Sequence, residues 1–223
     1  MTDWDRVKEL KQWIGEALQE LEDVLQGKPD LLERWLDEEM RIRFPGGVIR
    51  TVQSVKEGVP FFEVEGNEVL AANVAYHLQW ADVLEWLLFR LNLEFSAASM
   101  ACKMGIVAYA HIAAGMAVAF LRWYQAVTGE SVKALESTKM DFGQLLGFLW
   151  KQVFHSSGYR AKKVKKLKKS LEDLWETRNR IHVENSRLVA EKEYREYERE
   201  DFLHAKETVM HFLEVLKEVC QIL

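Results

Sequence analysis

The sequence has few of the residues that form disulfides, bind metals or break helices. Its 223 residues include two cysteines, three prolines and twelve glycines. Cys102 and Cys220 stand alone, without a Cys-x-x-Cys pair or a neighbouring histidine, so they predict reduced thiols rather than a disulfide or a zinc site. Because proline is scarce, there are few points at which a long helix has to end.

The sequence also lacks the short motifs of several enzyme classes and of secreted proteins. Met1 is followed by TDWDRVKELKQW, which has no apolar h-region and predicts a cytoplasmic protein. It has no glycine-rich phosphate loop, no HExxH pair and no nucleophile elbow, so we expect neither a metal nor a cofactor. The net charge of −5 argues against wholesale coating of nucleic acid but leaves local basic patches open.

One long apolar run is present, GIVAYAHIAAGMAVAFL at residues 105–121. At about 1.5 Å per residue it would form roughly 26 Å of helix, at the short limit for a hydrocarbon core of ~30 Å. The run is rich in alanine and glycine rather than leucine, and His111 stands in its middle. This composition is typical of the central helix of a soluble bundle, so we expect no membrane span.

Helical periodicity is the strongest signal along the chain. Apolar residues recur every three or four positions over residues 4–25, and DLLERWLDEEMRIRF after the GKP break predicts a second helix. A long helical region is expected to open at Asn67, followed by the alanine-rich helix to about Thr128. A further helical region is expected after Thr128, with a break near TKMDFG. Two more helices are expected, one from about residue 160 to 188 and one from residue 201 to the end of the sequence.

The pattern changes between residues 45 and 66. VIRTVQSV and VPFFEVEG, separated by KEG, are typical of two short strands or an extended crossover. We therefore expect an all-α fold, a helical bundle with a small extended or β-hairpin insertion near 45–66. Residues 1–66 are assigned to N-terminal helices plus this insertion, packed on a bundle formed by residues 67–223.

Arg178 interrupts the apolar stripe of the helix that begins near Val164. A leucine there would stabilise the fold by about 1.5–3 kcal/mol, whereas burying an unpaired guanidinium costs several kcal/mol. Three interpretations follow. The side chain pairs with a carboxylate at the edge of the bundle, or it lines a cleft or subunit interface without chemistry, or it contacts a phosphate.

TRNRIHVEN at residues 177–185, followed by an acidic linker and the last helix, resembles the C-terminal half of HEPN domains. The resemblance covers about residues 67–222 and is closest at 174–185. It implies a HEPN-like bundle with metal-independent endoribonuclease activity, working as a homodimer through the motif helix in toxin–antitoxin systems or antiviral defence. An antitoxin or effector complex would be a partner. The interval of three residues between the arginine and the histidine is shorter than is usual in the family.

On this resemblance Arg178, Asn179 and His182 are the catalytic residues. A histidine with an ordinary pKa of about 6.5 exchanges protons at neutral pH, and an arginine stabilises the charge on a pentacoordinate phosphorus. Asn179 would orient the histidine or hold a phosphate oxygen. Since the reaction benefits from an acid and a base while each chain supplies one such histidine, the chemistry favours a two-fold dimer.

A basic segment directly precedes this motif and is expected to bind RNA. We assign phosphate contacts to Arg160, Lys162, Lys163, Lys165, Lys166 and Lys169. The alternative is a solvated helix start that is balanced by the acidic residues of 191–201. Two competing functions also stay open: a non-catalytic helical module that binds RNA or protein, and a purely structural bundle.

Overall fold

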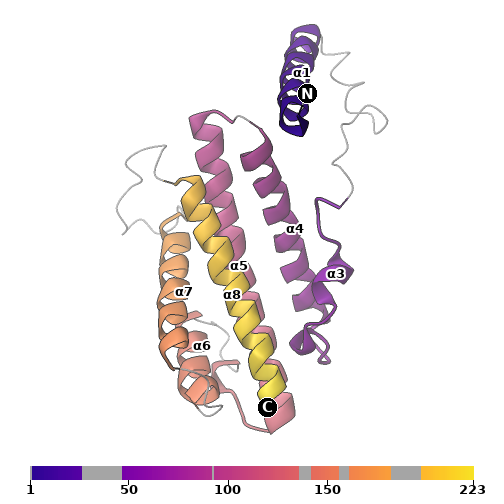
Figure 1. Cartoon of the computed structure of the whole chain (residues 1–223). Helices are drawn as coiled ribbons and strands as arrows, with labels where there is room; N and C mark the ends of the chain where they lie inside the picture. The colour runs from indigo at the N-terminus through magenta and orange to yellow at the C-terminus, as the bar shows by residue number, and fades with distance from the viewer. Residues whose placement is uncertain (1, 27–46, 92, 136–141, 156–160, 182–196) are drawn as a thin grey trace. The chain divides into compact units, whose positions relative to one another are not determined.

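The computed structural model describes residues 2–26, 47–91, 93–135, 142–155, 161–181 and 197–223. The chain divides into two compact units, residues 1–45 and 46–223. Across the described ranges every regular element is helical, which confirms the all-α expectation (Figure 1). The first unit contributes α1 (Asp3–Leu25), where the periodicity predicted a helix. The second helix expected in this unit lies outside the described residues.

The centre of the second unit is a hairpin of two long helices, α4 (Glu68–Arg90) and α5 (Phe95–Thr128). Small residues let the two helices approach closely, because a Cβ added to Gly115 would lie 2.6 Å from Val74 Cγ2. Asn67, fully buried just before α4, donates from Nδ2 to the carbonyl oxygens of Phe61 and Ala119 at 2.8 and 3.0 Å. These contacts fix an antiparallel register in which the start of α4 meets the end of α5.

Helix α8 (Arg199–Ile222) runs along α5, and α7 (Ala161–Ile181) packs against both (Figure 1). A Cβ added to Gly105 would overlap the ring of Phe202, so α5 and α8 are also in close contact. Lys206 of α8 reaches Glu85 of α4 with Nζ 2.6 Å from Oε1. An ion pair as well as apolar packing therefore holds α8 against the α4–α5 hairpin.

The smaller helical elements lie between α5 and α7 in the sequence. They are η3 (Lys133–Leu135), α6 (Phe142–Phe148) and the π-helical turn η4 (Leu149–Phe154). Gly129, with a φ of 74°, ends α5 at the position that the sequence predicted. The loop expected after η4 falls mainly outside the described residues.

Helix α5 passes a length-and-composition test for a membrane span, since one of its 18-residue windows has a mean hydropathy of 1.8. In the structure 72% of that window is buried inside the protein. Its fully buried residues include Tyr109, Ile112 and Phe120. Such burial is what the core helix of a bundle shows, and one helix of this kind is weak evidence for a membrane.

The insertion expected near residues 45–66 differs from the prediction. The described part of this segment holds a short helix, α3 (Val52–Lys56), and a 3-10 turn, η2 (Pro60–Phe62), and no strand. Thr51 caps α3 because its hydroxyl accepts a hydrogen bond from the Ser54 amide at 3.0 Å. The local cap outweighs the β-branched residues on which the strand prediction depended.

Burial rather than strand pairing holds this segment to the bundle. Phe61 is completely buried and packs edge-to-face against Phe120 of α5, with ring centroids 5.8 Å apart. Arg50 pairs with the buried carboxylate of Asp82 on α4. The compact unit begins at Gly46, whereas the sequence placed a boundary at residue 66.

Candidate functional site

Arg178 lies in the last turn of α7, where its side chain is half-buried. Nη1 donates to Asn179 Oδ1 at 3.0 Å, and Nη2 lies 3.2 Å from Nε2 of His111 on α5. The guanidinium carbon is 4.9 Å from the centre of the Trp175 ring, in a cation–π contact. The apolar positions before it, Val164 to Leu174, are buried as the stripe predicts. Arg178 therefore joins α7 to α5 through His111.

The contact with Arg178 defines the tautomer of His111. A guanidinium carries only donors, so the Nε2 atom that faces it must accept, and the ring proton of a neutral His111 lies on Nδ1. A protonated His111 would set an N–H and a second positive charge against the guanidinium. The arrangement thus favours a neutral imidazole as long as no anion stands between the two side chains.

A second histidine, His77 of α4, completes this cluster. Its ring meets the His111 ring edge-to-face, with centroids 5.1 Å apart. Burial lowers the pKa of His77 from its ordinary value, so it too is neutral at physiological pH. Neither histidine was predicted to take part in the site. Only the antiparallel register of α4 and α5, in which these two positions face each other, could have revealed the pair.

The His77–His111 pair lines one end of a groove between α4 and α5, which we call the α4–α5 groove. It has a volume of about 500 Å³. Leu70, Val74 and Val118 give it apolar walls, and Trp175 of α7 borders it. Its full lining is Gly66, Val69, Leu70, Asn73, Val74, His77, His111, Ala114, Gly115, Val118, Arg122, Phe142, Leu145 and Trp175.

Arg122 stands at the other end of the α4–α5 groove. Its Nη1 donates to Gly66 O at 3.0 Å and lies 3.4 Å from Asn67 Oδ1. Both acceptors are neutral, and within the described ranges no carboxylate pairs with this exposed side chain. A cation without a carboxylate partner is therefore available at the open edge of the groove.

The residues predicted as catalytic are only partly described. Arg178 and Asn179 lie side by side on α7 and contact each other, whereas His182 lies outside the described residues. The prediction that His182 shares a site with Arg178 therefore stays a prediction. What the structure adds to Arg178 is His111, from a helix on which the sequence placed no site.

The predicted RNA-binding cations are also described in part. Lys165, Lys166 and Lys169 are exposed on α7, as phosphate contacts require. Lys168 pairs with Glu172 one turn on, with Nζ 3.2 Å from Oε1. Arg160 and the side chains of Lys162 and Lys163 lie outside the described residues.

The described lysines do not all point the same way. Lys166 lines a shallow groove of about 490 Å³ between α7 and α8, together with Ser170, His204 and His211. By helical spacing Lys165 lies on the opposite side of the buried stripe, toward the Trp175 side of α7. Positive charge thus flanks α7 on both sides.

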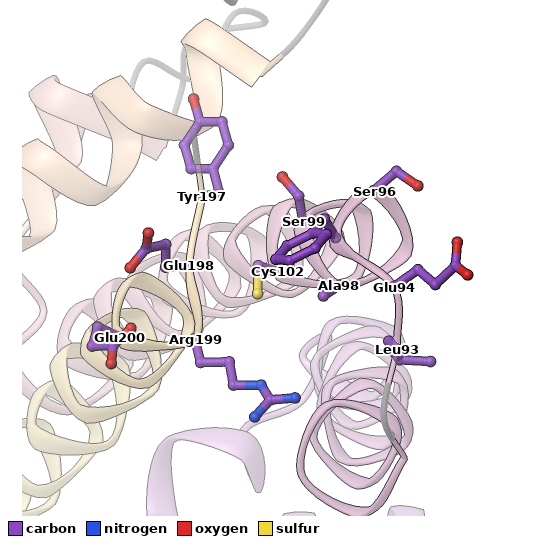
Figure 2. A pocket seen from close by; sticks show the side chains of 11 residues that line it. Leu93, Glu94, Ser96, Ala98, Ser99, Cys102, Tyr197, Glu198, Arg199 and Glu200 are labelled. Carbon is purple, nitrogen blue, oxygen red and sulfur yellow. The ribbon is translucent and has the colours of Figure 1, made fainter. Parts of the chain in front are cut away.

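A larger cavity of about 990 Å³ lies where α5 and α8 begin (Figure 2). Figure 2 shows the first turns of α5 on one side and Tyr197 to Glu200 on the other. Three carboxylates, Glu94, Glu198 and Glu200, line it against the single cation Arg199. This charge distribution repels a phosphate, so the cavity is a poor candidate for binding RNA.

Cys102 also lines this cavity, but its thiol is unreactive. Burial, and next the carboxylate of Asp201, raise its pKa to about 11. Burial also raises the pKa of Cys220 to about 12. Both thiols are free and protonated at neutral pH, so neither serves as a nucleophile. In the described part of the chain no three His, Cys, Asp or Glu side chains come together as metal ligands.

Comparison of the chain with protein-family models, with curated proteins and with solved structures found no match. The resemblance to HEPN domains therefore depends on the motif residues alone. The function has to be argued from the chemistry of the α4–α5 groove and of the α7 surface.

Proposed function

We propose that this protein is a metal-independent endoribonuclease of HEPN type that acts as a homodimer in the cytoplasm. The observation that supports it most is the place of Arg178, half-buried beside the α4–α5 groove and in contact with an imidazole. A guanidinium, an imidazole and an amide at one point are the groups that phosphodiester transfer needs. A role in toxin–antitoxin systems or antiviral defence, with an antitoxin or effector complex as partner, belongs to the same proposal.

In the proposed reaction His182 takes the proton of the ribose 2′-hydroxyl as that oxygen attacks the adjacent phosphorus. The bond from phosphorus to the 5′-oxygen breaks, and the leaving oxygen receives a proton from a second imidazole. The products are a 2′,3′-cyclic phosphate and a 5′-hydroxyl. Arg178 donates to the non-bridging oxygens as their charge increases, while Asn179 holds the guanidinium in place through its 3.0 Å contact.

The basic surface of α7 supports RNA as the substrate. Lys165, Lys166 and Lys169 are exposed and precede the arginine on the same helix. Phosphate contacts of this kind give affinity that is independent of sequence and decreases with salt. The lysines would hold the strand while Arg178 contacts the bond that is cleaved.

The proposed dimer brings the motif helices of two protomers together. The second imidazole of the reaction then comes from the partner's copy of the motif. Sedimentation of the purified protein should give the mass of a dimer at the concentrations at which it cleaves RNA. An active monomer would contradict this part of the proposal.

The central experiment is cleavage of end-labelled single-stranded RNA in the presence of EDTA. We expect His182→Ala to reduce the rate about 10²–10⁴-fold, since it removes a general acid or base. Arg178→Lys keeps the charge but loses the planar fork, and should cost about 10²-fold or more. His155→Ala, at an exposed histidine that follows η4, is the matched control and should cleave at the wild-type rate.

Circular dichroism of each variant shows whether the helices remain folded. Equal cleavage by the wild type and by His182→Ala would exclude the catalytic role of His182. If neither protein cleaves any RNA, the nuclease proposal is wrong.

The alternative is a non-catalytic HEPN-like module that binds RNA or a partner protein. One observation favours it: Arg178 is engaged by His111, Asn179 and Trp175, and these contacts stabilise the junction of α5 and α7. In that case the protein binds RNA with a strong salt dependence but leaves it intact. Arg178→Lys would then lower stability rather than change a rate.

A further inference from the structure

Two features of the α4–α5 groove are not used in the reaction proposed above. One is Arg122, which lies at the end opposite to the histidines and pairs with no described carboxylate. The other is the His77–His111 pair, which sits at the mouth of the groove rather than on the motif helix. Both are polar groups at the ends of a hollow that is otherwise mostly apolar.

The two ends are separated by three turns of helix. His111 and Arg122 are eleven residues apart on α5, which corresponds to about 16 Å along the helix axis. A volume of about 500 Å³ is within the range of sites that enclose a small organic ligand. The groove therefore extends along about three turns of α5, with Arg122 at one end and the two histidines at the other.

The walls between the ends suit a flat, apolar group. Leu70, Val74 and Val118 line them, and Trp175 borders them with its indole ring. Trp175 also stacks on Phe142, with ring centroids 4.7 Å apart, so its orientation is fixed. Apolar walls of this kind can cover the flat face of a nucleobase, as they do in most sites for small organic ligands.

We propose that the α4–α5 groove binds single-stranded RNA, with bases on its apolar walls and phosphates at Arg122 and at the His111–Arg178 end. This inference rests on the proposed function, since it names the substrate as an unpaired strand that enters between α4 and α5. Base-paired RNA would not enter, because its bases are stacked within the duplex.

The chemistry of the Arg178 end is consistent with an anion. In the structure the guanidinium lies against Nε2 of His111. A phosphate oxygen placed there accepts from the guanidinium and also stabilises a protonated imidazole. The 3.2 Å contact between Arg178 and His111 is thus a place that a phosphate can share.

The test measures binding of a 2′-O-methyl pentanucleotide, which is long enough to reach both ends of the groove, to the full-length protein by calorimetry. The 2′-O-methyl group blocks cleavage, so binding is measured apart from catalysis, and a short strand limits contacts with the lysines of α7. Arg122→Gln removes the distal cation, and Asn73→Trp fills the groove from an exposed position on α4. We expect each to weaken binding at least about tenfold.

Two control variants make the same chemical changes outside the groove. Arg90→Gln removes an exposed cation at the end of α4, and Tyr76→Trp adds an indole to an exposed position on the same helix. Both should bind within about twofold of the wild type. Wild-type affinity in both Arg122→Gln and Asn73→Trp would overturn the inference, and so would tighter binding of a duplex of the same sequence.

The outcome separates this inference from the nuclease proposal. If the pentanucleotide binds in the groove but no RNA is cleaved, the inference about the groove holds and the nuclease proposal is wrong. If RNA is cleaved while Asn73→Trp and Arg122→Gln bind and cleave like the wild type, the groove does not bind RNA and the nuclease proposal holds.

Discussion

Asn67 shows how much of the fold depends on one buried amide. It is completely buried, and its Nδ2 group donates to carbonyl oxygens of two segments, η2 and α5. Its Oδ1 atom also lies 3.4 Å from Nη1 of Arg122 at the end of the α4–α5 groove. The residue thus links the segment before α4, the helical hairpin and the groove.

We expect Asn67→Ala to lower the free energy of unfolding by about 2–4 kcal/mol, because two buried carbonyl oxygens lose their donor. Urea denaturation followed by circular dichroism measures this. Asn73→Ala, at an exposed position of the same helix, should change stability by less than about 0.5 kcal/mol. A similar loss in both variants would contradict the role given to Asn67.

His77 makes stability depend on pH. Burial lowers its pKa in the folded protein, while the unfolded chain has the ordinary value of about 6.5. Below that value the unfolded state binds the proton first, so stability decreases as the pH falls through the folded pKa. Above about pH 6.5 the contribution is fully present.

Replacing this histidine should therefore flatten the pH profile. His77→Gln, measured by urea denaturation between about pH 5 and pH 8, is expected to lose less stability on acidification than the wild type. Parallel profiles for the two proteins would show that His77 does not cause the dependence.

At the scale of the elements, α5 and α8 come very close together at Gly105. A side chain at Gly105 would overlap Phe202, which is itself fully buried and cannot move aside easily. Small residues on α5 allow this approach, as Gly115 does against α4. The alanine- and glycine-rich composition of α5 is therefore a packing requirement.

Gly105→Ala is expected to destabilise the protein by about 1–3 kcal/mol through overpacking. Gly147→Ala is the matched control, since no atom lies within 4 Å of a Cβ built there on α6. It should be neutral or stabilise by up to about 1 kcal/mol through helix propensity. Thermal unfolding of both variants distinguishes the two cases, and equal melting temperatures would contradict the packing argument.

Periodicity predicted α7 and α8 well because one face of each is buried continuously. The end of α5 at Thr128 and the buried stripe of α7 from Val164 to Leu174 follow from local sequence alone. The β-hairpin expected near residues 45–66 is not confirmed, because Thr51 caps a short helix where the sequence suggested a strand. The contact of Arg178 with His111 was beyond prediction, since it joins residues 67 positions apart through tertiary packing.

At the scale of the whole molecule, the net charge of −5 conceals a basic helix. Acidic residues elsewhere outnumber the lysines of α7, and Lys168 is partly neutralised by Glu172. Exposed Lys165, Lys166 and Lys169 nevertheless present positive charge along one element. Overall charge is therefore a poor guide to what this protein binds.

Replacing Lys165, Lys166 and Lys169 together by glutamine should reduce the salt dependence of RNA binding. The slope of log K against log salt should fall by about 2, because each lysine that neutralises one phosphate of a single strand contributes about 0.7. Titration of a labelled single strand at several salt concentrations measures it. The same number of substitutions at Arg90, Lys133 and Lys151, all exposed and outside α7, should leave the slope unchanged.

The burial of α5 has a consequence for how the chain is made. Its most apolar window is covered in part by α8, yet about 70 residues lie between the end of α5 and the start of α8. At ribosomal rates of about 5–20 residues per second, α5 waits about 4–14 s for that cover during translation. Throughout that interval the apolar surface of α5 that α8 will cover is exposed, so chaperones can bind it and it can aggregate. The synthesis of α8 is therefore the step that completes the burial of α5.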